Sequence, residues 1–123
     1  MVSPRIALGR AGEERAVKHL TSLGYEVIER NYRCHHGEID IVARDGSTLV
    51  FIEVKTRRSR EFGSGSEAVG NPKRKKIIQC AQEYIVLRNC EDVDARYDVV
   101  EVYFQDGQPV TVEVVKGAFW EEE

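Results

Sequence analysis

The sequence predicts an α/β fold in which α-helices flank a central mixed β-sheet. Helical and strand-like patterns follow one another along the chain in the order α-β-β-β-α-β-β. Turn signals separate neighbouring strand-like runs, at Asp45-Gly46 and at Asp106-Gly107. Because the chain has 123 residues and no internal repeat, we expect a single domain over residues 1–123.

Helices are expected over residues 4–23 and 71–88. Ser3 and Pro4 predict the start of the first helix, because serine caps helix N-termini and proline is favoured at the first helical position. Within this helix, Glu13 falls among the apolar positions that should face the sheet. A carboxylate at such a position needs a partner or a function.

Five runs rich in β-branched and aromatic residues predict strands, at residues 25–33, 38–44, 48–56, 95–104 and 109–116. Residues 57–70, between the third strand and the second helix, are rich in glycine, serine and arginine. They contain few large apolar side chains, so this segment is predicted to be a mobile loop.

The composition is that of a globular protein, with 41% hydrophobic and 32% charged residues. No apolar run approaches the roughly 20 residues of a membrane span. Charged residues between positions 5 and 14 exclude the apolar core of a signal peptide. The three cysteines show no C-x-x-C spacing, which argues against a disulfide framework and for reduced thiols. We therefore expect a cytoplasmic protein that does not associate with membranes.

Two acidic residues and one lysine interrupt strongly apolar strands. Glu53 and Lys55 are two positions apart, so they project from the same face of their strand. A hairpin with the preceding strand would bring Asp40 beside them. Carboxylate oxygens are the ligands that Mg²⁺ or Mn²⁺ prefers, so Asp40 and Glu53 are predicted to hold the metal, and Glu13 to complete its shell.

Such a site would hydrolyse phosphodiester bonds with the help of the metal ion. Lys55 would either orient or deprotonate the attacking water or stabilise the negative charge that develops, and the sequence does not decide between these roles. Glu38 is a further candidate ligand, although its position favours a supporting role.

Basic residues cluster after the third strand although the formal net charge is −3. Phosphate groups respond to the local potential and not to the net charge, so this region is predicted to bind nucleic acid. The candidate side chains are Arg57, Arg58, Arg60, Lys73, Lys75 and Lys76. The alternative is a solvated basic loop and helix end without a ligand.

Two other groups of residues suggest chemistry less strongly. Cys-His-His at residues 34–36 offers zinc-binding side chains, but three adjacent residues cannot all turn toward one tetrahedral ion. We interpret this segment as a turn near the site. Arg96 and Asp98 are expected to have a structural role.

Several motifs together resemble the YraN family of small bacterial proteins. They are Gly12-Glu13, Asn31-Tyr32-Arg33, Gly37-Glu38-Ile39-Asp40, Phe51-Ile52-Glu53-Val54-Lys55, Arg57 and Arg96-Tyr97-Asp98-Val99-Val100. That family is similar to archaeal Holliday junction resolvases, which have the restriction-endonuclease-like fold and the PD-(D/E)xK motif. The resemblance implies that Asp40 is the motif aspartate, that Glu53 and Lys55 are the E-x-K pair, and that Glu13 is the helix acid. Ile39 replaces the motif's proline, which is not a ligand.

The sequence therefore predicts a Mg²⁺-dependent endonuclease of the PD-(D/E)xK type. We expect DNA as the substrate. Recognition should depend on branched or other DNA structure, because no base-reading helix or finger is evident. Two alternatives stay open: a nucleic-acid-binding module without catalysis, and an accessory subunit of a DNA-processing complex. Resolvase-like relatives usually act as dimers, so the resemblance also implies a possible homodimer.

Overall fold

The computed structural model describes residues 2–58 and 71–119. Its elements are α1 (Pro4–Ser22), β1 (Glu26–Cys34), β2 (Gly37–Asp45), β3 (Thr48–Arg57), α2 (Asn71–Leu87), β4 (Ala95–Gln105) and β5 (Gln108–Phe119). The α/β class and the order α-β-β-β-α-β-β are confirmed, and this architecture agrees with the restriction-endonuclease-like fold that the resemblance implies. The mobile loop predicted at 57–70 lies outside the described residues from position 59 onward.

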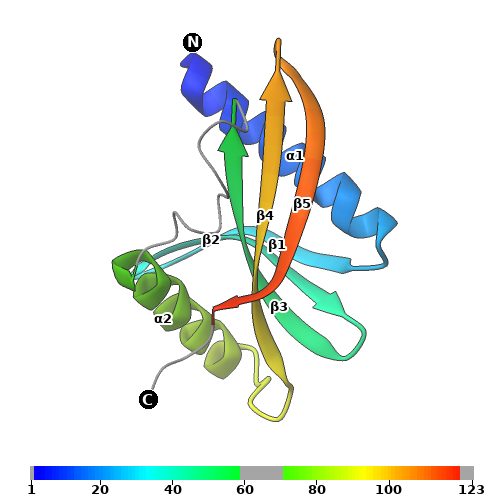
Figure 1. The fold of residues 1–123 in the computed structure, drawn as a ribbon. Coiled ribbons are helices and arrows are strands. Elements are labelled where there is room, and N and C mark those ends of the chain that lie inside the picture. The colour runs from blue at the N-terminus through cyan, green and yellow to red at the C-terminus, as the bar shows by residue number, and fades with distance from the viewer. Residues whose placement is uncertain (1, 59–70, 120–123) are drawn as a thin grey trace.

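The five strands form one mixed sheet in the order β1-β2-β3-β4-β5 (Figure 1). Neighbouring strands are antiparallel except for β3 and β4, which are parallel. Two parallel neighbours require a crossover connection, and α2 lies in that connection. The mixed sheet therefore follows from placing one helix between the third and fourth strands.

The two helices pack on opposite faces of the sheet, each over its own apolar core (Figure 1). Successive side chains of β3 alternate between these cores: Phe51 packs under α2 with Tyr84, and Ile52 packs under α1 with Leu20. All four side chains are almost fully buried. Both faces of β3 are covered, which explains why this strand reads as a nearly continuous apolar run.

Gly12 sets the distance between α1 and the sheet. It is buried on the inner face of the helix, and any side chain at this position would collide with Thr56 of β3. Only glycine allows so close an approach. The next residue, Glu13, lies against β1, where Arg30 and Asn31 contact its carboxylate, and its charge influences Asp40 of β2.

The expectation of three reduced cysteines is wrong. Cys34, at the end of β1, and Cys80, on the inner side of α2, form a disulfide with a Cα–Cα distance of 5.7 Å, while Cys90 is free. These two positions are 46 residues apart in the sequence. Sequence spacing identifies local cysteine pairs, whereas this pair depends on how α2 docks against the β1–β2 hairpin.

No helix within the described part of the chain is both long and apolar enough to cross a membrane. The cytoplasmic location stays a prediction.

Candidate functional site

The β2–β3 hairpin brings the two predicted metal-binding carboxylates together. Ile41 pairs with Ile52 across the two antiparallel strands, so Asp40 and Glu53 are the next residues along each strand. Glu53 is only 6% exposed. Asp40 is half-buried, and its Oδ2 accepts a hydrogen bond of 2.8 Å from the backbone N–H of Val54.

The proximity of these carboxylates is energetically unfavourable for two negative charges. Burial and the charge of Glu53 raise the pKa of Asp40 to about 8, although the hydrogen bond from Val54 opposes this rise. Without a bound metal ion, the raised pKa of Asp40 favours its protonated form at neutral pH. A carboxylate pair of this kind is a place where a positive charge is stabilised.

Two lysines supply positive charge at this pair. Lys73, in the first turn of α2, forms an ion pair with Glu53. Partial burial lowers the pKa of Lys73, but its interactions with Glu53 outweigh burial and give a net rise. Burial and the neighbouring Lys73 lower the pKa of Lys55. One lysine thus keeps its proton firmly while the other releases it more easily.

Glu13 lies at the edge of this cluster. Its Oε1 accepts hydrogen bonds from Asn31 at 2.9 Å and from Arg30 at 3.4 Å. Its charge nevertheless contributes to the raised pKa of Asp40. Glu13 is therefore close enough to influence the pair electrostatically, while its carboxylate is oriented by β1. Its role as a third ligand stays a prediction.

Among the residues that the structure describes, no group of three or more His, Cys, Asp or Glu side chains is arranged to hold a metal ion. A divalent cation at this site would therefore have only two carboxylates of the described residues as ligands, those of Asp40 and Glu53. Cys34 is part of a disulfide, and Glu38 forms a distant ion pair of 3.9 Å with Arg33.

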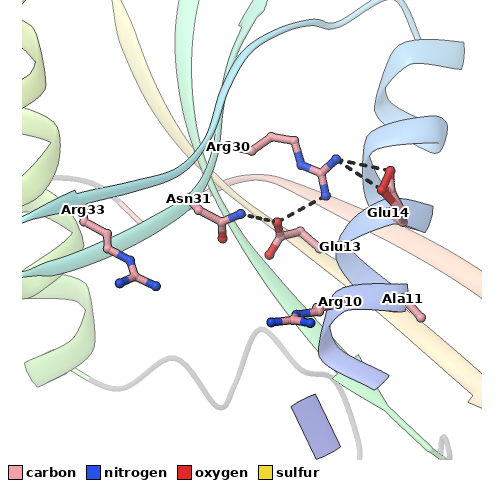
Figure 2. A pocket seen from close by; sticks show the side chains of 7 residues that line it. All are labelled: Arg10, Ala11, Glu13, Glu14, Arg30, Asn31 and Arg33. Carbon is pink, nitrogen blue, oxygen red and sulfur yellow. Dashed lines mark hydrogen bonds and ion pairs between the residues drawn. The ribbon is translucent and has the colours of Figure 1, made fainter. Parts of the chain in front are cut away.

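An open cleft of about 580 Å³ lies between α1 and β1, next to Glu13 (Figure 2). Its lining residues are Arg10, Ala11, Glu13, Glu14, Arg30, Asn31 and Arg33. Arg30 is held by both oxygens of Glu14 at 3.2 Å. Arg10 has no hydrogen bond or ion pair to another described residue, and the Arg33 side chain is 81% exposed. The exposed guanidinium group of Arg33 thus lines this cleft together with Arg10, although Arg33 also forms the distant ion pair with Glu38.

Sequence reasoning missed this cleft. Arg10 lies one helical turn before Glu13, so the two share a helix face, and Arg33 lies on the edge strand. The three-residue spacing between Arg10 and Glu13 could have indicated that an arginine lies beside the predicted helix acid. Charged residues on a helix and an edge strand are, however, usually solvated, and nothing local indicates that α1 and β1 converge.

The residues predicted to bind nucleic acid are distributed around the cluster. Arg57 ends β3, and its Nε is buried without a hydrogen-bond partner among the residues that the structure describes. Arg58 follows it and is exposed, as are Lys75 and Lys76 on α2. Arg60 lies outside the described residues. Nucleic-acid binding by this set stays a prediction.

A second charged cluster lies on the α1 face of the sheet. Asp98 is fully buried and accepts hydrogen bonds from the Tyr25 hydroxyl at 3.0 Å, Arg96 Nε at 2.9 Å and the Gly117 backbone at 2.9 Å. Arg96 also contacts Asp45 at 2.8 Å. Every charge here has a partner, which agrees with the structural role expected for Arg96 and Asp98.

Comparison with known proteins identifies the family. The family model described as "Uncharacterised protein family UPF0102" matches residues 12–102. A UPF0102 protein of Caldicellulosiruptor saccharolyticus is 42% identical over 113 residues, which cover 91% of this chain and 96% of that protein. A UPF0102 protein of Moorella thermoacetica is 44% identical over 120 residues, covering 97% and 100%. The chain belongs to the UPF0102 family, which confirms the resemblance to YraN proteins.

Proposed function

We propose that this protein is a metal-dependent nuclease that hydrolyses phosphodiester bonds in DNA. The observation that carries the proposal is the convergence of Asp40 and Glu53 beside Lys55. The raised pKa of Asp40 supports it, because a structural ion pair would leave the carboxylate stabilised and not strained.

The donor set fits Mg²⁺ or Mn²⁺. Carboxylate oxygens are the preferred ligands of these hard cations, and the ammonium group of Lys73 already occupies a cationic position at Glu53. Asp40 and Glu53 would hold the ion. When bound, it would supply a Lewis acid that offsets negative charge on the phosphate.

Lys55 is proposed to act as the base that activates the attacking water. Its lowered pKa increases the fraction of neutral amine at neutral pH, and a base is most effective when its pKa lies near the working pH. The alternative role, in which the ammonium stabilises the developing negative charge, would require Lys55 to stay protonated. Of these two roles, the lowered pKa favours the first.

Basic groups on both sides of the carboxylates would hold the DNA backbone. On the α1 side, Arg10 and Arg33 line the cleft that Figure 2 shows. On the other side, Arg58 follows the end of β3 and is exposed, so its guanidinium is accessible to a phosphate oxygen. These contacts read phosphates and not bases, which supports recognition of DNA structure over sequence.

The proposal is tested by a cleavage screen over linear, flap and four-way-junction DNA with Mg²⁺ and with Mn²⁺. The wild type should cut at least one substrate, and Asp40→Asn should not. Lys18→Ala removes an exposed lysine of α1 outside the cluster and should cleave like the wild type. If the wild type and Asp40→Asn give the same background on every substrate, the nuclease proposal is wrong.

A non-catalytic DNA-binding module, alone or as an accessory subunit, is the second candidate. The observation that favours it is the cleft itself, because Arg10 and Arg33 would bind phosphate without any chemistry at Asp40. Such a protein would show salt-dependent DNA binding that the metal does not affect. The homodimer stays a prediction for either function.

A further inference from the structure

Lys73 differs from the other basic residues of its helix turn. Its side chain is 48% exposed, yet its ammonium reaches a carboxylate of Glu53 that is only 7% exposed. Lys75 and Lys76 are exposed and form no ion pair with a described residue. One lysine of a basic segment is thus drawn to the carboxylate pair.

This placement has costs that the ion pair must offset. A positive charge in the first turn of a helix is unfavourable with respect to the helix dipole. Ordering a long lysine side chain also costs conformational entropy. The ion pair with Glu53 offsets both costs, because the low exposure of this carboxylate strengthens the attraction between opposite charges.

Lys55 is the obvious alternative partner, since it lies two positions from Glu53 on the same strand and face. The ion pair is nevertheless formed with Lys73, from the other side of the crossover. The ion pair to Glu53 is therefore made by a residue of α2 and not by the strand that carries the motif.

We propose that Lys73 is the built-in counter-ion of the Asp40–Glu53 pair and that a divalent cation must displace it from Glu53 in order to bind. This inference rests on the proposed function, because it assumes that the pair holds a metal ion. The displaced ammonium stays tethered beside the pair, where it is available to a phosphate of the DNA. Lys73 is thus a positioning residue that exchanges one anionic partner for another.

The physical basis is competition for the same oxygen atoms. A carboxylate oxygen that binds an ammonium group is not free for a divalent ion. The observed metal affinity is therefore the intrinsic affinity multiplied by the fraction of molecules in which the ion pair is open. Removing the ammonium should therefore tighten metal binding. A lysine that only binds DNA would leave the metal affinity of the free protein unchanged.

The test is calorimetric titration of the full chain with MnCl₂, for the wild type, Lys73→Gln and Lys73→Arg. Lys73→Gln should bind Mn²⁺ about tenfold more tightly, the effect of removing one charge-assisted hydrogen bond that competes with the ion. Lys73→Arg keeps the charge and should stay close to the wild type. Lys75→Gln removes a nearby charge without a contact to the pair, and its metal affinity should change by less than about twofold.

The outcomes separate this inference from the proposed function. If the wild type binds Mn²⁺ and Lys73→Gln binds it no more tightly than Lys75→Gln, the displacement is wrong while the metal site stands. If no protein in the series binds Mn²⁺, both the displacement and the nuclease proposal are overturned.

A second measurement uses only the wild type and so does not depend on the folding of a variant. Acetylation of lysines with an amine-reactive reagent is followed by mass spectrometry, with and without MnCl₂. Lys73 should become several-fold more reactive when the metal is present, with Lys75 as the internal control. Unchanged or reduced reactivity of Lys73 on saturation with Mn²⁺ would overturn the displacement.

Discussion

Two clusters of charged side chains on the described part of the sheet, one on each face, balance their charges differently. On the α1 face, the buried carboxylate of Asp98 receives hydrogen bonds from Arg96, Tyr25 and a backbone N–H group. On the α2 face, Asp40 lies next to a second carboxylate, Glu53, and its pKa is raised. Every charge of the first cluster has a partner, whereas Asp40 in the second has a like charge beside it and no ion pair with a described residue.

This difference suggests that the α1-face cluster around Asp98 serves stability and that the α2-face cluster around Asp40 serves function. A buried charge with complete partners contributes to a defined fold, and removing one partner is costly. Two like charges side by side destabilise the folded protein. Such an arrangement is typical of sites that act on another molecule. Variants of the two clusters should therefore fail in opposite ways.

The largest expected effect is on catalysis in the α2-face cluster. Lys55→Ala should lower the rate of DNA cleavage by about 10²–10⁴-fold, the usual contribution of a general base. The unfolding midpoint should stay near that of the wild type, because Lys55 is partly exposed. Single-turnover cleavage and thermal unfolding of the same preparations measure both quantities. A Lys55→Ala protein that is folded and cleaves normally would remove Lys55 from the mechanism.

The α1-face cluster should show the reverse behaviour. Asp98→Ala leaves Arg96 and Tyr25 without their buried partner, so the free energy of unfolding should fall by about 3–5 kcal/mol. Asp40→Ala relieves repulsion and should cost less than about 1 kcal/mol. Urea denaturation measures both variants. If Asp40→Ala were the more destabilising of the two, the distinction between the clusters would fail.

The sequence was sufficient to predict the elements and the closeness of two acidic residues, Asp40 and Glu53. A short hairpin fixes the register of β2 and β3, so the proximity of Asp40 and Glu53 follows from alternation and one turn. The position of Lys73 depends instead on how α2 docks on the sheet. Local patterns give the inner face of a helix but not its height or angle on the sheet.

The same reason explains the other features that were missed or mistaken. The disulfide between Cys34 and Cys80 requires the docked position of α2. The arginine cleft requires α1 to lie beside β1, and that approach depends on Gly12. Each of these features joins elements that are distant in sequence.

The disulfide attaches the helix that carries Lys73 to the hairpin that carries Asp40. Its reduction should lower the free energy of unfolding by about 2–4 kcal/mol, because the unfolded chain loses a long closed loop. Denaturation with and without a reducing agent measures this, with Cys90→Ser as the control for the free thiol. An equal stability of both forms would show that the bond contributes nothing to holding α2.

The pH dependence of stability should distinguish the clusters more finely. The pKa of Asp40 is higher in the folded protein than in the unfolded chain, so the folded state binds more protons between about pH 4 and about pH 8. Metal-free wild type should therefore lose stability relative to Asp40→Asn as the pH rises through this range. Thermal unfolding of both proteins at several pH values measures the difference. Parallel curves would mean that Asp40 titrates normally.

The smallest expected effect concerns the cleft. Replacing Arg10 and Arg33 together by alanine should reduce the slope of log affinity against log salt by about 2, one for each phosphate contact. Fluorescence anisotropy with labelled DNA measures the slope, and Lys18→Ala serves as the control. A slope equal to that of the wild type would place the DNA backbone elsewhere.

The most direct test of the central claim is Mn²⁺ titration of the wild type and Asp40→Asn in two buffers of different ionisation enthalpy. The wild type should bind the ion saturably near neutral pH and release about one proton per ion, because the cation replaces the proton that Asp40 retains. Asp40→Asn should lose both the binding and the proton release. Equal binding by both proteins would contradict the claim that this carboxylate pair is the metal site.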